Sequence, residues 1–170
     1  AFGNGLIGFL DDFIKVIKHR NLGLTAWQKI VLQVAVTVGF MIGLHSLGLL
    51  STSVMFPVAG MVDLGLAYYP IAFFGIIFLV NAVNLTDGLD GLAAGIAAIA
   101  SFFLFLIAFG RGLEETAMLS IILLGATLAF LRYNFAPASI FMGDSGSLLL
   151  GAMIGVISLM GVMRSPTVIV

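Results

Sequence analysis

Cysteine is missing from this chain, and charged residues are scarce. Without cysteine, neither a disulfide framework nor a thiolate metal site can form. Seven Lys or Arg and eight Asp or Glu, fifteen in all, make up 9% of the 170 residues, against about 25% in soluble domains. A soluble core of this size needs a charged shell, which so few side chains cannot supply. Hydrophobic residues account for 61% of the chain, so the composition predicts an integral membrane protein.

The first ten residues are apolar, but they lack a leading Met, a basic region and a small-residue cleavage site, so we do not expect a signal peptide. This stretch is typical of the last turns of a membrane span that begins upstream. We therefore expect residues 1–170 to form a single transmembrane domain that is a fragment of a longer protein.

Five apolar runs approach the length of about 20 residues that a hydrocarbon core of about 30 Å requires. They lie at residues 27–50, 68–85, 92–109, 116–131 and 148–162. We expect the polar segment 11–25 to be a loop outside the bilayer, and 51–66, which holds Pro57, Gly60 and Asp63, to be a short connector or small hairpin. The predicted fold class is all-α, a polytopic transmembrane helix bundle of about five full spans plus a partial N-terminal one.

The chain is most distinctive between residues 81 and 92, where two amides and two carboxylates close an apolar run. If this segment is helical, the four polar residues follow one another at i, i+3 steps and form a stripe, namely Asn81, Asn84, Asp87 and Asp90. The alternative is a turn between helices, in which Asn and Asp are caps and the glycines end the helix. The spacing alone leaves both open.

Two further acidic segments are Asp11-Asp12 and Phe141-Met142-Gly143-Asp144-Ser145-Gly146-Ser147. Asp144 precedes an apolar run and could be the N-cap of the fifth span. Each span carries the chain to the other side of the membrane, so all three acidic segments are predicted to emerge on one face. That face also holds more basic residues than the other, which makes it cytoplasmic by the positive-inside rule; the residues are Lys15, Lys18, Arg20, Lys29 and Arg132, against Arg111 and Arg164.

Carboxylates without His or Cys partners are hard oxygen ligands, which suit Mg²⁺ held by one or two carboxylates and substrate phosphates. Convergence of three such segments on one membrane face indicates phosphoryl chemistry at the cytoplasmic interface.

The residues themselves carry a resemblance. Asp11-Asp12, Asn84-Leu85-Thr86-Asp87-Gly88-Leu89-Asp90-Gly91-Leu92 and Phe141-Met142-Gly143-Asp144-Ser145-Gly146-Ser147 resemble, in order and spacing, the three acidic signatures of the polyprenyl-phosphate N-acetylhexosamine-1-phosphate transferases. The segment 20–25, Gln28-Lys29 and Thr86 resemble the phospho-N-acetylmuramoyl-pentapeptide transferase branch. Relatives of this kind have about ten spans, of which this chain resembles the middle half.

The resemblance implies an enzyme that joins undecaprenyl phosphate to the sugar phosphate of UDP-N-acetylmuramoyl-pentapeptide, with release of UMP and Mg²⁺ as cofactor. It implies Asp144 as metal ligand and Asp11, Asp12 and Asp87 as catalytic residues. The residues implied in substrate binding are Lys15, Asn84, Asp90, Asn134 and Phe141, the last by stacking on uracil. The partners would be the two substrates and the lipid bilayer, with no nucleic-acid polymer. The resemblance also allows a homodimer, in a bacterial cytoplasmic membrane with the active face cytoplasmic.

Other functions remain open from the sequence. The N-acetylglucosamine branch of the same superfamily is one, and a covalent aspartate intermediate is an alternative mechanism. An ion channel or transporter subunit would use the polar stripe as an intramembrane ion site, although the acidic residues cluster at span ends. In a structural membrane subunit, the acidic motifs would be helix caps only.

Overall fold

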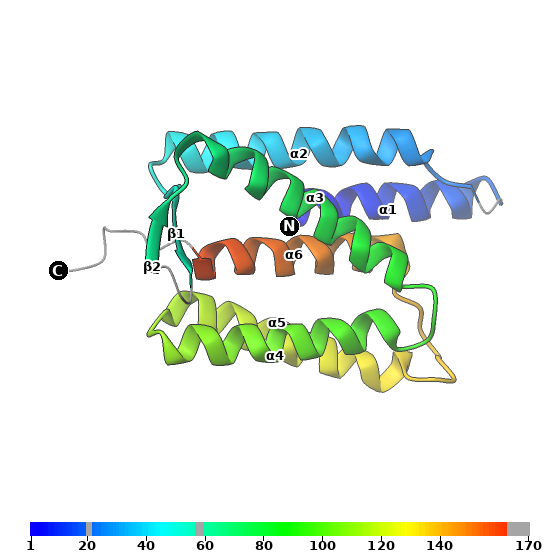
Figure 1. The fold of residues 1–170 in the computed structure, drawn as a ribbon. Coiled ribbons are helices and arrows are strands. Elements are labelled where there is room, and N and C mark those ends of the chain that lie inside the picture. Colours follow the sequence, from blue (N-terminus) through cyan, green and yellow to red (C-terminus); the bar gives the residue numbers. More distant parts are fainter. Residues whose placement is uncertain (20–21, 57–59, 163–170) are drawn as a thin grey trace.

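The structure is a computed structural model that describes residues 1–19, 22–56 and 60–162 (Figure 1). Within these residues the chain forms six α-helices, one 3-10 turn and one β-hairpin. In chain order the elements are α1 (Phe2–Ile17), α2 (Ala26–Ser46), β1 (Ser53–Phe56), β2 (Gly60–Asp63), η1 (Gly65–Ala67), α3 (Tyr68–Thr86), α4 (Leu92–Gly110), α5 (Glu114–Asn134) and α6 (Gly143–Val162).

Five of the helices, α2 to α6, are long and apolar enough to cross a membrane. The stretches concerned are 19 to 22 residues long, close to the roughly 20 residues that a bilayer core requires. The predicted all-α polytopic bundle is confirmed, and the chain is a multi-pass membrane protein. The small hairpin expected within residues 51–66 is also present, with β1 and β2 paired antiparallel from Ser53 opposite Asp63 to Phe56 opposite Gly60.

Local sequence explains where several helices begin. Thr25 caps α2 in a reciprocal capping box with Gln28, in which each side chain accepts from the other residue's backbone N–H at 3.3 and 2.9 Å. Pro70 lies in the first turn of α3, where a missing N–H removes no helical hydrogen bond. Glu114 and Glu115 in the first turn of α5 face the positive end of the helix dipole.

Two sequence expectations about boundaries are wrong. The acidic pair Asp11-Asp12 is not in a loop, because α1 continues through it to Ile17. The last helix starts at Gly143 rather than near residue 148, so its polar first turn is helical. Of the two alternatives left open for residues 81–92, the turn is present beyond Thr86, since α3 ends there and Gly91 adopts φ +75° before α4. Arg20, Pro57 and Arg164, also used above, lie outside the described residues.

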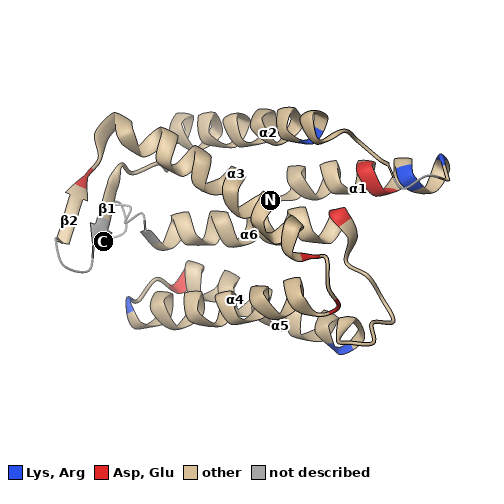
Figure 2. Ribbon diagram, turned by 45° about the vertical axis from the view of Figure 1, so that its right-hand side comes forward, with Lys and Arg blue, Asp and Glu red and all other residues tan. Residues whose placement is uncertain are grey.

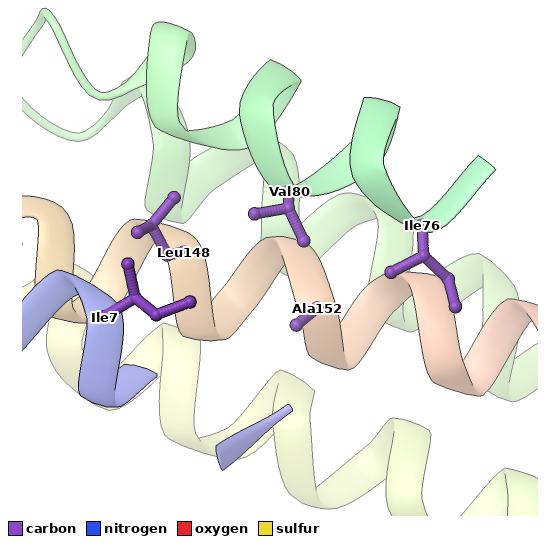
Figure 3. Packing of buried hydrophobic residues seen from close by; sticks show 5 residues of the cluster. All are labelled: Ile7, Ile76, Val80, Leu148 and Ala152. Carbon is purple, nitrogen blue, oxygen red and sulfur yellow. The ribbon is translucent and has the colours of Figure 1, made fainter. Parts of the chain in front are cut away.

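Helix α6 occupies the centre of the bundle, with α1, α2 and α3 on one side and the α4–α5 pair on the other (Figure 1). Ile7 of α1 and Ile76 and Val80 of α3 pack on the α6 surface formed by Leu148 and Ala152 (Figure 3). The buried face of α4 consists largely of alanine, which allows close packing of its neighbours, as membrane helices commonly do; its buried residues are Ala93, Ala94, Ala97, Ala98, Ser101 and Ala108.

Charged residues lie at the two ends of the bundle, and the middle of the helices is free of them in the part of the chain described (Figure 2). The β-hairpin is at one end, and the ends of α1, α3 and α5 meet the starts of α2, α4 and α6 at the other (Figure 1). This second end holds the acidic segments.

Candidate functional site

Asp11 is the most enclosed member of the acidic site. It is 0% exposed, although it lies only six residues before the end of α1. Its Oδ1 accepts a hydrogen bond of 2.6 Å from the backbone N–H of Leu24 and lies 3.2 Å from Lys29 Nζ. Its Oδ2 lies 2.5 Å from Lys15 Nζ, one helical turn further along α1. Asp11 therefore joins α1, the segment before α2, and α2 itself.

Asp144, in the first turn of α6, contacts the same two ammonium groups. Lys29 donates to its Oδ2, and Lys15 Nζ lies 3.3 Å from that oxygen. The other oxygen, Oδ1, accepts a hydrogen bond of 3.0 Å from Asn84 Nδ2 of α3, which also donates to Ser147 Oγ at 2.8 Å. The Asp144 side chain is 16% exposed, so it remains reachable from outside the bundle. The N-cap alternative for Asp144 is wrong, because α6 already begins at Gly143, one residue earlier. The Asp144 backbone N–H donates to a residue of another helix.

Asp12 accepts the hydrogen bond from the Asp144 backbone N–H. Its Oδ1 accepts from the Asp144 backbone N–H at 3.3 Å, and its Oδ2 accepts from the backbone N–H and Oγ of Ser145 at 2.9 and 2.7 Å. Lys15 Nζ also donates to Oδ1 at 3.3 Å. Asp12 thus binds the N-terminus of α6 from another helix.

Glycine allows α1 and α6 to approach this closely. A Cβ on Gly8 would lie 2.1 Å from the Asp144 carbonyl oxygen and 2.6 Å from the Ser145 backbone nitrogen. These are backbone atoms, which cannot rotate away. Only a residue without a side chain allows the two helices to meet at this point.

The three carboxylates of Asp11, Asp12 and Asp144 offer oxygen atoms that all lie within 4.8 Å of one another. Three negative charges at this separation require cations nearby, and the ammonium groups of Lys15 and Lys29 lie among them. A set of carboxylate oxygens is the donor chemistry that Mg²⁺ prefers. The site can therefore hold a divalent cation, and its lysines can bind phosphate oxygens.

Asp87 belongs to the same end of the bundle but not to the three-carboxylate cluster. It is the C-cap residue of α3. Burial raises the pKa of Asp87 to about 6, and the negative charges of Asp144 and Asp12 add to the effect. The Asp87 carboxyl group can therefore gain or lose a proton close to neutral pH.

The remaining predicted site residues lie beside the cluster, Asp90 and Phe141 in loops and Asn134 as the last residue of α5. Asp90 Oδ2 accepts from the Ala138 backbone N–H at 2.9 Å. Asn134, which is 3% exposed, accepts from the Gly91 backbone N–H at 3.1 Å and donates to the Ile140 carbonyl at 2.9 Å. These two side chains thus join the segment between α3 and α4 to the segment between α5 and α6. Phe141 is 75% exposed and its ring is open to a ligand.

Comparison with known proteins agrees with this arrangement. The model of glycosyl transferase family 4 matches residues 1–162. The chain belongs to this family.

Several curated relatives are similar to this chain over most of its length. The phospho-N-acetylmuramoyl-pentapeptide-transferase of Halalkalibacterium halodurans is 47% identical over 161 residues, which cover 94% of this chain and 49% of that protein. The protein of the same name from Clostridioides difficile is 48% identical over 151 residues, 88% of this chain and 47% of the relative. The one from Bacillus subtilis is 44% identical over 161 residues, 94% and 49% of the two chains. The chain spans about half the length of the curated relatives that it matches.

Lys29 is a member of the site that the sequence places on the acidic face without a role. Its position in the sequence indicates a role in the site, because Lys29 lies four residues after the helix cap Thr25, at the start of an apolar span. A lysine there needs an anionic partner. Ser145 was quoted as part of a motif but given no role, since its contact with Asp12 spans 133 residues of chain.

Below the carboxylates, two amide side chains connect α2 to α3. Asn81 Nδ2 donates to Gln33 Oε1 at 2.7 Å and to the Ile77 carbonyl at 2.8 Å. Gln33 is 0% exposed. It lies one helical turn after Lys29, as Asn81 lies one turn before Asn84. The amide pair therefore fixes α2 against α3 directly beneath the two side chains that reach Asp144.

Proposed function

We propose that the protein transfers phospho-N-acetylmuramoyl-pentapeptide from its UDP conjugate to undecaprenyl phosphate and releases UMP. The observation that carries the proposal is the meeting of Asp11, Asp12 and Asp144 around two lysines at one end of a membrane bundle. The names of the relatives, which are 41–48% identical to this chain, favour this substrate over UDP-N-acetylglucosamine. Placement of the charges at the bundle ends, rather than along its interior, favours an enzyme over an ion-conducting subunit (Figure 2).

Asp144 is the proposed ligand of Mg²⁺, with the Asp11 carboxylate beside it. The ion would neutralise pyrophosphate charge as UMP leaves. Lys15 and Lys29 bind phosphate oxygens as compact point charges. In this proposal the protein acts mainly by positioning two anionic substrates and stabilising charge, as is usual for phosphoryl transfer.

The other predicted residues complete the proposed site. Asp11 orients the lipid phosphate, whose second pKa near 6 makes strong base catalysis unnecessary at neutral pH. Asp87, with its raised pKa, exchanges a proton with the substrate phosphates. Asn84, Asp90 and Asn134 border the nucleotide-sugar pocket, and Phe141 stacks on uracil.

The proposed location is the bacterial cytoplasmic membrane, with the acidic end on the cytoplasmic side. Lys15, Lys18, Lys29 and Arg132 belong to that end, which supports the assignment by the positive-inside rule. Both substrates would reach the site from there, the lipid from the bilayer and the nucleotide sugar from the cytoplasm. We also propose that residues 1–170 are one transmembrane domain and that a homodimer is the form in the membrane.

The test is Mg²⁺-dependent exchange of labelled UMP into the nucleotide sugar by the full-length protein in membranes. Asp144→Asn removes one charge from the site and should lower exchange at least about 100-fold, the scale on which one charge-stabilising group contributes. Glu115→Gln is the matched control, because it removes an exposed carboxylate from the opposite end of the bundle, and it should exchange normally. Normal exchange by Asp144→Asn would overturn the assignment of the site. Exchange with UDP-N-acetylglucosamine alone would overturn the choice of substrate.

A further inference from the structure

Asp12 and Asp11 are neighbours in sequence, yet their carboxylates have different surroundings. We propose that Asp12 is a positioning residue, whose carboxylate caps the N-terminus of α6 from α1 and so fixes the direction of Asp144. It holds neither metal nor substrate. The inference rests on the proposed function, since the group that Asp12 positions is the proposed metal ligand.

Helix α6 has no cap from the residues that precede it. The first four N–H groups of an α-helix have no partner within the helix, and a side chain just before the helix normally accepts from one of them. Before α6 the chain reads Ile140-Phe141-Met142, followed by Gly143 at φ +65°. These residues have no side-chain oxygen or nitrogen that could accept, and the thioether sulfur of Met142 is only a weak acceptor. The start of α6 therefore needs a cap from elsewhere.

Asp12 supplies that cap from a helix 132 residues earlier in the chain. It accepts from two consecutive N–H groups, those of Asp144 and Ser145, at 3.3 and 2.9 Å, and also from Ser145 Oγ at 2.7 Å. A negative charge at this position also opposes the positive end of the helix dipole. Gly143 leaves room for it, because a Cβ there would lie 2.8 Å from Asp12 Oδ2.

The acceptor positions of the Asp12 carboxylate are filled by protein donors. An ionised carboxylate has about four lone-pair sites, and Asp12 receives four donors, three from α6 and Lys15 Nζ at 3.3 Å. A metal ion on Asp12 would have to displace one of them. Lys15 contacts all three carboxylates. The Asp11 oxygens accept from the Leu24 N–H and contact Lys29 as well, which makes three donors, and both of its ammonium partners are shared with Asp144.

The cap also fixes the backbone of the proposed metal ligand. The residue whose backbone N–H is bound by Asp12 is Asp144, and the carboxylate of Asp144 is bound by Asn84 and Lys29. Backbone and side chain of Asp144 are thus fixed from α1, α2 and α3 together. A functional group needs such support, since a tolerance of about 0.5 Å separates a productive site from an unproductive one.

The experiment compares Asp12→Asn and Asp12→Ala in the full-length protein, with Asp144→Asn as reference. The readouts are kcat, KM, the Mg²⁺ concentration for half-maximal exchange, and thermal unfolding of the purified protein. Asn keeps one acceptor oxygen, which can still cap the Ser145 N–H, but it loses the second oxygen and the charge. Asp12→Asn should therefore keep at least a tenth of kcat and the wild-type Mg²⁺ dependence. Asp12→Ala should lose more than 100-fold in kcat with little change in KM.

Ser145→Ala tests the cap from the other side. It removes one of the donors to Asp12, so its effect should be largely absent when Asp12 is already alanine, because both changes act on the same contact. If Asp12→Ala does not fold, Asp12→Asn and Ser145→Ala still give the result.

Two outcomes would overturn the inference. A rise of tenfold or more in the Mg²⁺ requirement of Asp12→Asn, as expected for Asp144→Asn, would make Asp12 a metal ligand. Loss of turnover in Asp12→Asn as complete as in Asp12→Ala would make its charge or its proton essential. If the wild-type protein shows no exchange, the proposed function fails, and the cap is tested by thermal unfolding alone. The cap predicts a lower unfolding midpoint for Asp12→Ala than for Asp12→Asn. Equal midpoints would refute the cap.

Discussion

Gly8 lies where α1 meets the first turn of α6, and its replacement by alanine is a direct test of that contact. The new Cβ would lie 2.1 Å from the Asp144 carbonyl oxygen, whereas ordinary contact begins at 3.4 Å. The helices must therefore separate by about 1.3 Å, the difference between these two distances. Overpacking of this kind costs about 1–3 kcal/mol of stability.

The separation also affects the site. The hydrogen bond from the Ser145 N–H to Asp12, 2.9 Å long, would lengthen to about 4 Å, beyond the range in which such bonds form. Asp11 and Asp144, which contact the same lysines, would move apart as well. A displacement of about 1 Å can cost about 100-fold in rate, so we expect Gly8→Ala to lower UMP exchange by that factor.

Gly5→Ala is the matched control. It adds the same methyl group to the same helix, but its Cβ would meet the Leu149 side chain at 3.4 Å, an ordinary contact. The assay is Mg²⁺-dependent exchange in membranes, with the amount of folded protein measured in parallel. Wild-type exchange by Gly8→Ala, or an equal loss in both variants, would refute the reasoning from close helix contact.

Two other predictions concern protonation and topology. The pKa of Asp87 is raised to about 6, and the lipid phosphate titrates in the same range. Exchange should therefore fall as pH drops through about 6, and the fall should be shallower in Asp87→Asn; an identical profile in that variant would rule Asp87 out. A raised pKa means that the neutral carboxyl group of Asp87 favours the folded state. Its contribution to stability is complete below the ordinary Asp pKa of about 4 and is lost as pH rises through about 6. The unfolding midpoint of the wild type should therefore rise from pH 7 to pH 5 relative to that of Asp87→Asn. For topology, the chain has no native cysteine, so Lys18→Cys and Ser139→Cys should react with an impermeant thiol reagent from the cytoplasm and Glu115→Cys from outside. Reaction of Lys18→Cys and Glu115→Cys from the same side would contradict the proposed orientation.

The membrane spans could be predicted because each depends on one local property, an apolar run of sufficient length. Convergence of the acidic segments could also be predicted, since the number of crossings decides the face on which each segment emerges. The contacts within the site could not, because their partners are distant in the chain: Asp12 meets Ser145, and Lys29 meets Asp144, across more than a hundred residues. The start of α6 was misplaced for the same reason, since its cap comes from α1 and leaves no signal in the residues just before Gly143.

Helix α2 has an inverted arrangement of polarity, with consequences for how the protein enters the membrane. Its buried residues are Gln33, Thr37 and Met41, while Val31, Val38 and Ile42 on its other sides are exposed. Alone in the bilayer, this helix would present an amide to lipid, where polar groups without partners are costly. Asn81 of α3 supplies the partner. Helices α2 and α3 are therefore expected to leave the insertion machinery as a pair, and a ribosome stalled before Asn81 would leave α2 weakly held in the membrane.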